Sequence, residues 1–177
     1  SKHILVQDND YVKSGMPLSD GAMAPQDILE INGPKAVQQY IVNEVQDVYR
    51  LQGIPINDKH LEVIVRQMMS KVNVTNQGDS DLLENESVDK IDFLEENDRI
   101  FDKKVITDVG GSTVLKIGQI VSFRKIREEN SRLKRDGEKQ VKYRDAVPAT
   151  ATPVLQGITK SSLSTFSWIS AASFQET

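Results

Sequence analysis

The feature that most constrains the fold is a pair of neighbouring stretches with helical periodicity, residues 36–52 and 57–72. Apolar residues recur every three or four positions in both stretches, which places them on one face of each helix. Gly53 and Pro55 end the first helix, and Asn57 suits the N-cap of the second. The sequence predicts two amphipathic helices that pack on each other or on a common sheet, with stripes formed by Val37, Tyr40, Ile41, Val45, Val48 and Leu51 and by Leu61, Ile64, Val65, Met68 and Val72.

The residues before this helical pair favour extended structure. Short β-prone pieces in 1–31 are interrupted at Asn9-Asp10 and Ser14-Gly15, which predicts two short strands with turns. Together with the helices, they predict an α+β fold. We therefore expect four regions: strands and turns in 1–31, the helical pair in 32–72, a charged arm in 73–150 and a final segment in 151–177.

The arm is divided by charge. Residues 77–102 contain ten acidic and two basic residues, whereas 119–145 contain nine basic and five acidic ones. One interpretation is two solvated helices, at 89–101 and 123–136. The other is that the two segments neutralise each other or a partner. Gly110-Gly111 between them predicts a hinge or a hairpin turn.

The last part of the chain has few bulky residues. Residues 146–153, AVPATATP, predict an extended linker without regular structure. The following residues are rich in Ser, Thr and Ala, and they predict short helical turns at 159–163 and 167–174. Composition alone therefore predicts a flexible segment.

The composition excludes several classes of function. The chain has no cysteine and only two histidines, His3 and His60, so cysteine chemistry and a histidine-rich metal centre are not expected. Phosphate-binding glycine loops and nucleophile elbows are also missing. A net charge of -4 argues against a free-standing DNA-binding protein. With no apolar run long enough for a membrane span and no signal-peptide pattern, we expect a cytoplasmic protein without a membrane partner.

Two long segments resemble a known family. Residues 40–72, YIVNEVQDVYRLQGIPINDKHLEVIVRQMMSKV, and 153–177, PVLQGITKSSLSTFSWISAASFQET, closely resemble segments of the beta-prime (largest catalytic) subunit of bacterial DNA-directed RNA polymerase, in the same order. Residues 10–39 are similar to what precedes them in that family. Residues 84–114 look inserted relative to the family pattern, which suggests a lineage-specific insertion.

The resemblance implies a function in transcription. The fragment would belong to the C-terminal region of a nucleotidyltransferase and would contribute scaffold and clamp switch near the template strand. It would be inactive alone, because the family's magnesium loop and zinc ribbon lie outside these residues. The implied partners are the beta, alpha and omega subunits and template DNA. An independent protein-interaction module that uses the helical pair and the acidic arm is the alternative.

The resemblance of the final segment to the family's first switch segment supplies the candidate site. Lys160 would contact a template phosphate and Gln175 would hydrogen-bond to the template. Thr159 and Phe174 belong to the same candidate DNA-contact or switch site. Trp168 and Phe174 are interpreted as buried anchors of the hinge rather than as stacking platforms for bases. No catalytic residue and no metal ligand is predicted in this chain.

Overall fold

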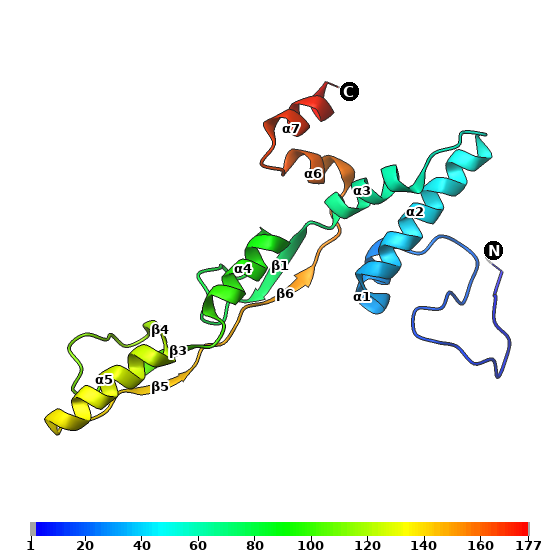
Figure 1. The fold of residues 1–177 in the computed structure, drawn as a ribbon. Helices are drawn as coiled ribbons and strands as arrows, with labels where there is room; N and C mark the ends of the chain where they lie inside the picture. Colours follow the sequence, from blue (N-terminus) through cyan, green and yellow to red (C-terminus); the bar gives the residue numbers. More distant parts are fainter. Residues whose placement is uncertain (1–2, 177) are drawn as a thin grey trace. The chain divides into compact units, whose positions relative to one another are not determined.

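A computed structural model describes residues 3–176, in which seven helices and two small antiparallel sheets form an α+β fold, as predicted (Figure 1). The chain forms two compact units. Unit 1 contains the residues up to Lys71 together with those from Pro153 onward, and unit 2 is Val72–Thr152.

Unit 1 is helical. Gly33, at φ 82°, ends the first helix, and Pro34 begins the second at a position where its missing N–H has no partner to lose. Asn57 caps the third helix as predicted, because its side chain accepts a 3.0 Å hydrogen bond from the Lys59 N–H. The helices are α1 (Pro25–Asn32), α2 (Pro34–Leu51), α3 (Asp58–Met68), α6 (Ile158–Leu163) and α7 (Trp168–Gln175).

The predicted helical pair is confirmed. α2 packs against both α1 and α3, and Val37 and Val65 are buried. A buried polar side chain joins the two helices of the pair: Gln46 Nε2 on α2 donates 2.7 Å hydrogen bonds to the Ile56 carbonyl and to Asp58 Oδ1. These bonds fix the turn between α2 and α3, and they give the buried Nε2 group two acceptors.

Three details of the helical region differ from the prediction. Residues 3–32 contain helix α1 and an isolated bridge between Ile4 and Ser19 instead of two strands. α3 ends at Met68, so Val72 lies in a strand and not on the helical stripe. Of the predicted stripes, Ile64, Val48 and Leu51 are 46%, 54% and 89% exposed, because both helices bury a narrower face than the periodicity indicates.

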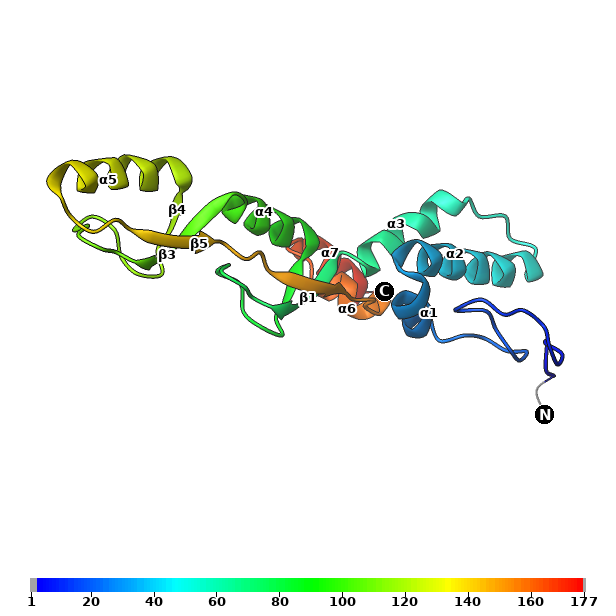
Figure 2. The same ribbon diagram turned by 90° about the horizontal axis from the view of Figure 1, so that it is seen from below.

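Unit 2 contains the same arrangement twice: a strand, a short strand, a helix and a returning strand. The first repeat is built from β1, β2, α4 and β6, and the second repeat, which lies between α4 and β6 in the chain, from β3, β4, α5 and β5. Figure 2 shows α5 lying over the sheet of the second repeat. The bounds are β1 (Lys71–Asn76), β2 (Ser87–Asp89), α4 (Lys90–Ile100), β3 (Lys103–Asp108), β4 (Ile120–Ser122), α5 (Phe123–Asp136), β5 (Lys142–Asp145) and β6 (Thr150–Pro153).

The sheets are β2-β1-β6 and β4-β3-β5. The helices predicted at 89–101 and 123–136 are confirmed as α4 and α5. The linker predicted at 146–153 is wrong in its second half, because Thr150–Pro153 forms β6 beside β1. Thr75 Oγ1 lies 3.0 Å from both the carbonyl and the hydroxyl of Thr150. Pairing with a distant strand therefore overrides the local preference of this sequence.

The two repeats have equivalent cores. In the second repeat, Ile106, Leu115, Val121, Ile126, Leu133 and Val141 pack together. The matching positions of the first repeat are also buried or half-buried, and they are Val74, Leu82, Val88, Phe93, Ile100 and Ala149. Six apolar side chains thus close each small sheet against its helix.

Candidate nucleic-acid interface

The predicted site lies on the last two helices of unit 1. Backbone hydrogen bonds fix the start of this segment, from the Val154 N–H to the Lys71 carbonyl at 3.3 Å and from the Gln156 N–H to the Met68 carbonyl at 2.9 Å. α6 packs against α3, and Ser161 on α6 is buried. The segment is therefore tied to the end of the helical pair through its backbone.

Lys160, Thr159, Phe174 and Gln175 are all exposed on these helices. The first two lie on α6 and the others on α7, and the two helices pack together. Within the described part of the chain, the side chains of Lys160 and Gln175 make no hydrogen bond or ion pair to other residues. The ammonium group is thus available, but the structure does not join the four side chains into one polar cluster.

Of the two residues interpreted as buried anchors, Trp168 is exposed in this chain, whereas Phe174 is only 37% exposed. Trp168 is 77% exposed, and the nearby Phe166 is 91% exposed. Ser and Ala side chains around them are too small to cover the rings. Large apolar surface on α6, α7 and their connection therefore faces outward.

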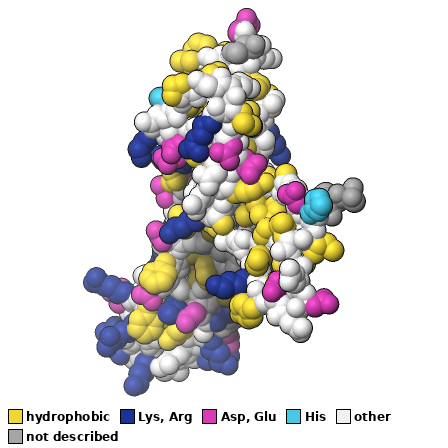
Figure 3. Space-filling view, turned by 90° about the vertical axis from the view of Figure 1, so that its right-hand side faces the viewer, with side chains coloured by type: hydrophobic (Ala, Val, Ile, Leu, Met, Phe, Trp, Pro, Cys, Tyr) yellow, Lys and Arg dark blue, Asp and Glu magenta, His cyan; other side chains and the backbone are white. Residues whose placement is uncertain are grey.

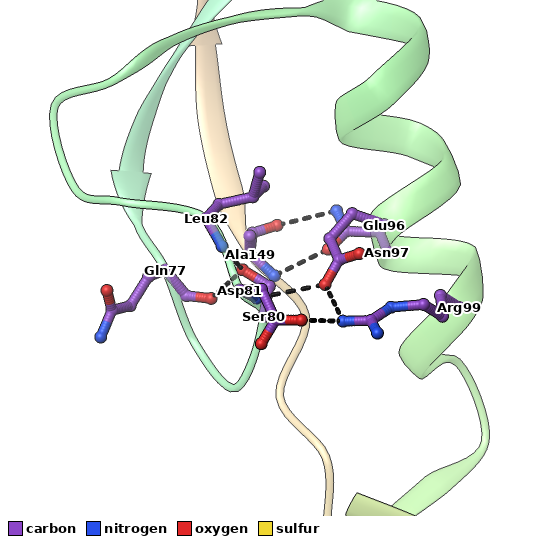
Figure 4. A network of polar contacts seen from close by, with 8 residues as sticks. All are labelled: Gln77, Ser80, Asp81, Leu82, Glu96, Asn97, Arg99 and Ala149. Atoms are coloured by element: carbon purple, nitrogen blue, oxygen red, sulfur yellow. Dashed lines mark hydrogen bonds and ion pairs between the residues drawn. The ribbon is translucent and has the colours of Figure 1, made fainter.

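Sequence reasoning missed a polar network in the first repeat of unit 2 (Figure 4). The side-chain amide of Asn97 on α4 forms two hydrogen bonds to the backbone of Ala149: Nδ2 donates to the carbonyl at 3.0 Å, and Oδ1 accepts from the N–H at 2.8 Å. Glu96 accepts from the Asp81 N–H at 3.1 Å, and Arg99 pairs with both Glu96 and Asp81. The helix thereby holds the turn on one side and the returning strand on the other.

The second repeat contains a similar network. Asn130 Nδ2 donates to the Val141 carbonyl at 3.3 Å, and Oδ1 accepts from its N–H at 2.7 Å. Glu129 pairs with Arg132 at 2.7 Å and accepts from the Ser112 hydroxyl at 2.6 Å. The signal was present in the sequence, because 95–100 reads EENDRI and 128–133 reads EENSRL.

The turns after β1 and β3 are also equivalent. Gly78 and Gly110 have φ of 56° and 54°, and their N–H groups donate to Asn76 Oδ1 and Asp108 Oδ1 respectively. A Cβ at Gly78 would collide with the carbonyl oxygens of Val147 and Pro148. One at Gly110 would meet the returning chain at Lys139 and Gln140 in the same way. Glycine is therefore required twice by conformation and by close approach of the backbone.

Ion pairs link the turns to the returning chain. The Arg144 guanidinium, hydrogen-bonded to Asp79, lowers the pKa of that carboxyl below its usual 3.8, and a hydrogen bond from the Val147 N–H lowers it further. In the second repeat, the Lys139 ammonium at 2.8 Å lowers the pKa of Asp108. Both carboxylates are thus held in their charged form.

The polar groups of the described residues do not form a metal centre. Within residues 3–176, no group of three or more His, Asp or Glu side chains is placed to hold a metal ion. In the same part of the chain, no helix is long and apolar enough to cross a membrane. Among these residues, exposed charge and exposed apolar surface are what the arrangement offers to a partner.

Comparison with known proteins decides the family. The family model of RNA polymerase Rpb1, domain 5, matches residues 1–166. The chain belongs to this family. It is 64% identical over its full length to the DNA-directed RNA polymerase subunit beta' of Parabacteroides distasonis. The identity is 65% to that of Bacteroides fragilis and 60% to that of Flavobacterium johnsoniae, again over the full chain.

The Rpb1 domain 5 chain spans 12% of the length of these three relatives. The matches include residues 84–114, so these relatives contain the region predicted to be inserted. That range begins in the turn after β1 and ends in the equivalent turn after β3. Its absence from other branches of the family stays a prediction.

Proposed function

We propose that this chain is the part of an RNA polymerase beta-prime subunit that serves as scaffold and clamp switch near the template strand. The observation that carries the proposal is the identity to beta' subunits, which extends over the whole length of this chain. It also favours the polymerase over an independent interaction module. Nucleotidyl transfer would belong to the complete enzyme, with its magnesium and zinc held by other parts of the subunit.

Exposed apolar side chains support a scaffold function. Leu51 at the end of α2 is 89% exposed, and Val48, Ile54 and Val63 on the same helical pair also face outward. Patches of this kind mark surfaces that other protein covers. We propose that the rest of beta-prime and the beta, alpha and omega subunits bury these side chains when the polymerase assembles in the cytoplasm.

Lys160 is the proposed template contact. Its ammonium group is exposed on α6 and unpaired within the described residues, whereas the backbone beneath it is fixed to α3. A cation in that position can neutralise a phosphate without reading sequence, as a polymerase requires. Gln175 would add a hydrogen bond, and Thr159 and Phe174 would shape the same surface.

The experiment is Lys160→Ala in a reconstituted polymerase, with Lys35→Ala on α2 as the matched control. Loss of one phosphate contact should lower the slope of log affinity for promoter DNA against log salt concentration by roughly 0.7 to 0.9. The open-complex lifetime should shorten, while elongation from a preformed complex changes less. An unchanged slope and lifetime would show that Lys160 does not contact the template.

A further inference from the structure

The two repeats of unit 2 allow their helices to be compared position by position. Residues that build the fold are shared: Asn97 matches Asn130, Glu96 matches Glu129, and Arg99 matches Arg132. The buried Ile100 corresponds to the buried Leu133. The two hydrogen bonds of the Asn amide to the returning backbone and the Glu–Arg ion pair recur in both repeats, so they report what the fold requires.

The exposed positions differ in charge: those of α5 are basic where those of α4 are apolar or acidic. Where α4 has Ile91, Asp92 and Leu94, α5 has Arg124, Lys125 and Arg127. At the helix end, Phe101 and Asp102 of the first repeat correspond to Lys134 and Arg135 of the second. Because the first repeat adopts the same fold without these cations, the fold does not require them. We therefore look for a function of the basic face of α5 in binding.

The geometry of this face suits a ligand with several negative charges. Among residues 3–176, Lys125, Arg127 and Lys134 pair with no carboxylate, and Arg124 makes only an exposed 3.0 Å contact with Glu128. Arg127 and Ser131 both line two shallow hollows, of about 240 and 370 Å³, the second of which also includes Glu128. Figure 3 shows many Lys and Arg side chains in the lower part of the view.

We propose that the outer face of α5, formed by Arg124, Arg127, Ser131, Lys134 and Arg135, binds the sugar-phosphate backbone of a nucleic acid. At 1.5 Å per residue the face extends for about 16 Å, which matches roughly five nucleotides of one strand. Arginine and lysine bind phosphate oxygens by charge-assisted hydrogen bonds and read no sequence there. The choice of nucleic acid over an acidic protein rests on the proposed function.

The test is crosslinking in the complete polymerase. Ser131 is replaced by photoreactive p-benzoylphenylalanine, and Asp98, which occupies the matching exposed position on α4, is replaced in the same way as the control. In elongation complexes with labelled DNA and RNA, the Ser131 probe should crosslink to nucleic acid at least fivefold more than the Asp98 probe. Crosslinks to protein alone, or equal yields from the two positions, would overturn the proposal.

A second measurement keeps the interpretation independent of the probe. Arg127→Gln combined with Lys134→Gln removes two unpaired cations at positions where the first repeat carries Leu and Phe. The salt slope for nucleic-acid binding by the polymerase should fall by roughly 1.4 to 1.8. A variant that assembles and transcribes with an unchanged slope refutes this inference alone, whereas a chain that never assembles with the other subunits refutes the proposed function.

Discussion

Replacing Asn97 by Ala tests whether the side-chain amides hold the repeats together. The substitution removes the 3.0 Å and 2.8 Å hydrogen bonds to Ala149, which is only 5% exposed. Each lost bond costs about 1 kcal/mol, and a buried backbone group left without a partner adds a further penalty of about 1 kcal/mol or more. The free energy of unfolding of unit 2 should therefore fall by about 2–4 kcal/mol.

Native-state hydrogen exchange measures this change where it occurs. Protection of the Val74 and Ala149 amides should drop in Asn97→Ala, and Asn130→Ala should have an effect of similar size on the Ile106 amide. Asn43→Ala, on an exposed position of α2, is the control and should leave unit 2 unchanged. A loss below about 1 kcal/mol in both repeats would show that the amides do not close the returning strands.

Three other predictions concern the repeats of unit 2 and the helical pair of unit 1. Joining Ile100 directly to Lys134, and Gln140 directly to Ala149, removes most of the second repeat but keeps its closing loop. This shortened chain should still unfold cooperatively in urea. Loss of cooperativity would refute the equivalence of the repeats. The lowered pKa of Asp79 means that its contribution to stability is present above its usual pKa and is lost as pH falls through the lowered value. Asp79→Asn should therefore flatten the pH dependence of unfolding below about pH 4, which acid titration followed by circular dichroism can check. In unit 1, Val37→Ala should cost about 1–3 kcal/mol and Ile64→Ala clearly less, because only Val37 is fully buried; equal costs in urea titration would contradict this packing.

Periodicity predicted the helices well, because each one carries its own signal. The spacing of apolar residues located α2 and α3, and the charged pattern located α4 and α5. Helix α1 was missed because the residues around it were interpreted as strands and turns, although Pro25 at its start and Asp27 in its first turn are typical of a helix N-terminus. The equally short α6 and α7 were predicted as helical turns at 159–163 and 167–174.

Strand β6 could not be predicted from its own residues. The segment around Thr150 is an ordinary loop sequence, and it becomes a strand because β1 offers a partner 75 residues earlier. The candidate contacts at Lys160 and Gln175 came from resemblance, and the structure adds only that their side chains are exposed. The duplicated network could have been found by comparing 95–100 with 128–133, since the same three polar side chains recur at the same spacing.

Nesting of one repeat inside the other has a consequence for the order of folding. The second repeat closes with partners 41 residues apart, such as Lys104 and Asp145, whereas the first must bring together Thr75 and Thr150, which are 75 apart. Once the second repeat has formed, the Ala146 N–H donates to the Lys103 carbonyl at 3.0 Å, so the two ends of the second repeat lie together. The loop that the first repeat must close is then effectively shortened, which reduces its entropic cost. During synthesis the second repeat is complete before β6 is made, so we expect it to form first and to prepare the closure of the first repeat around it.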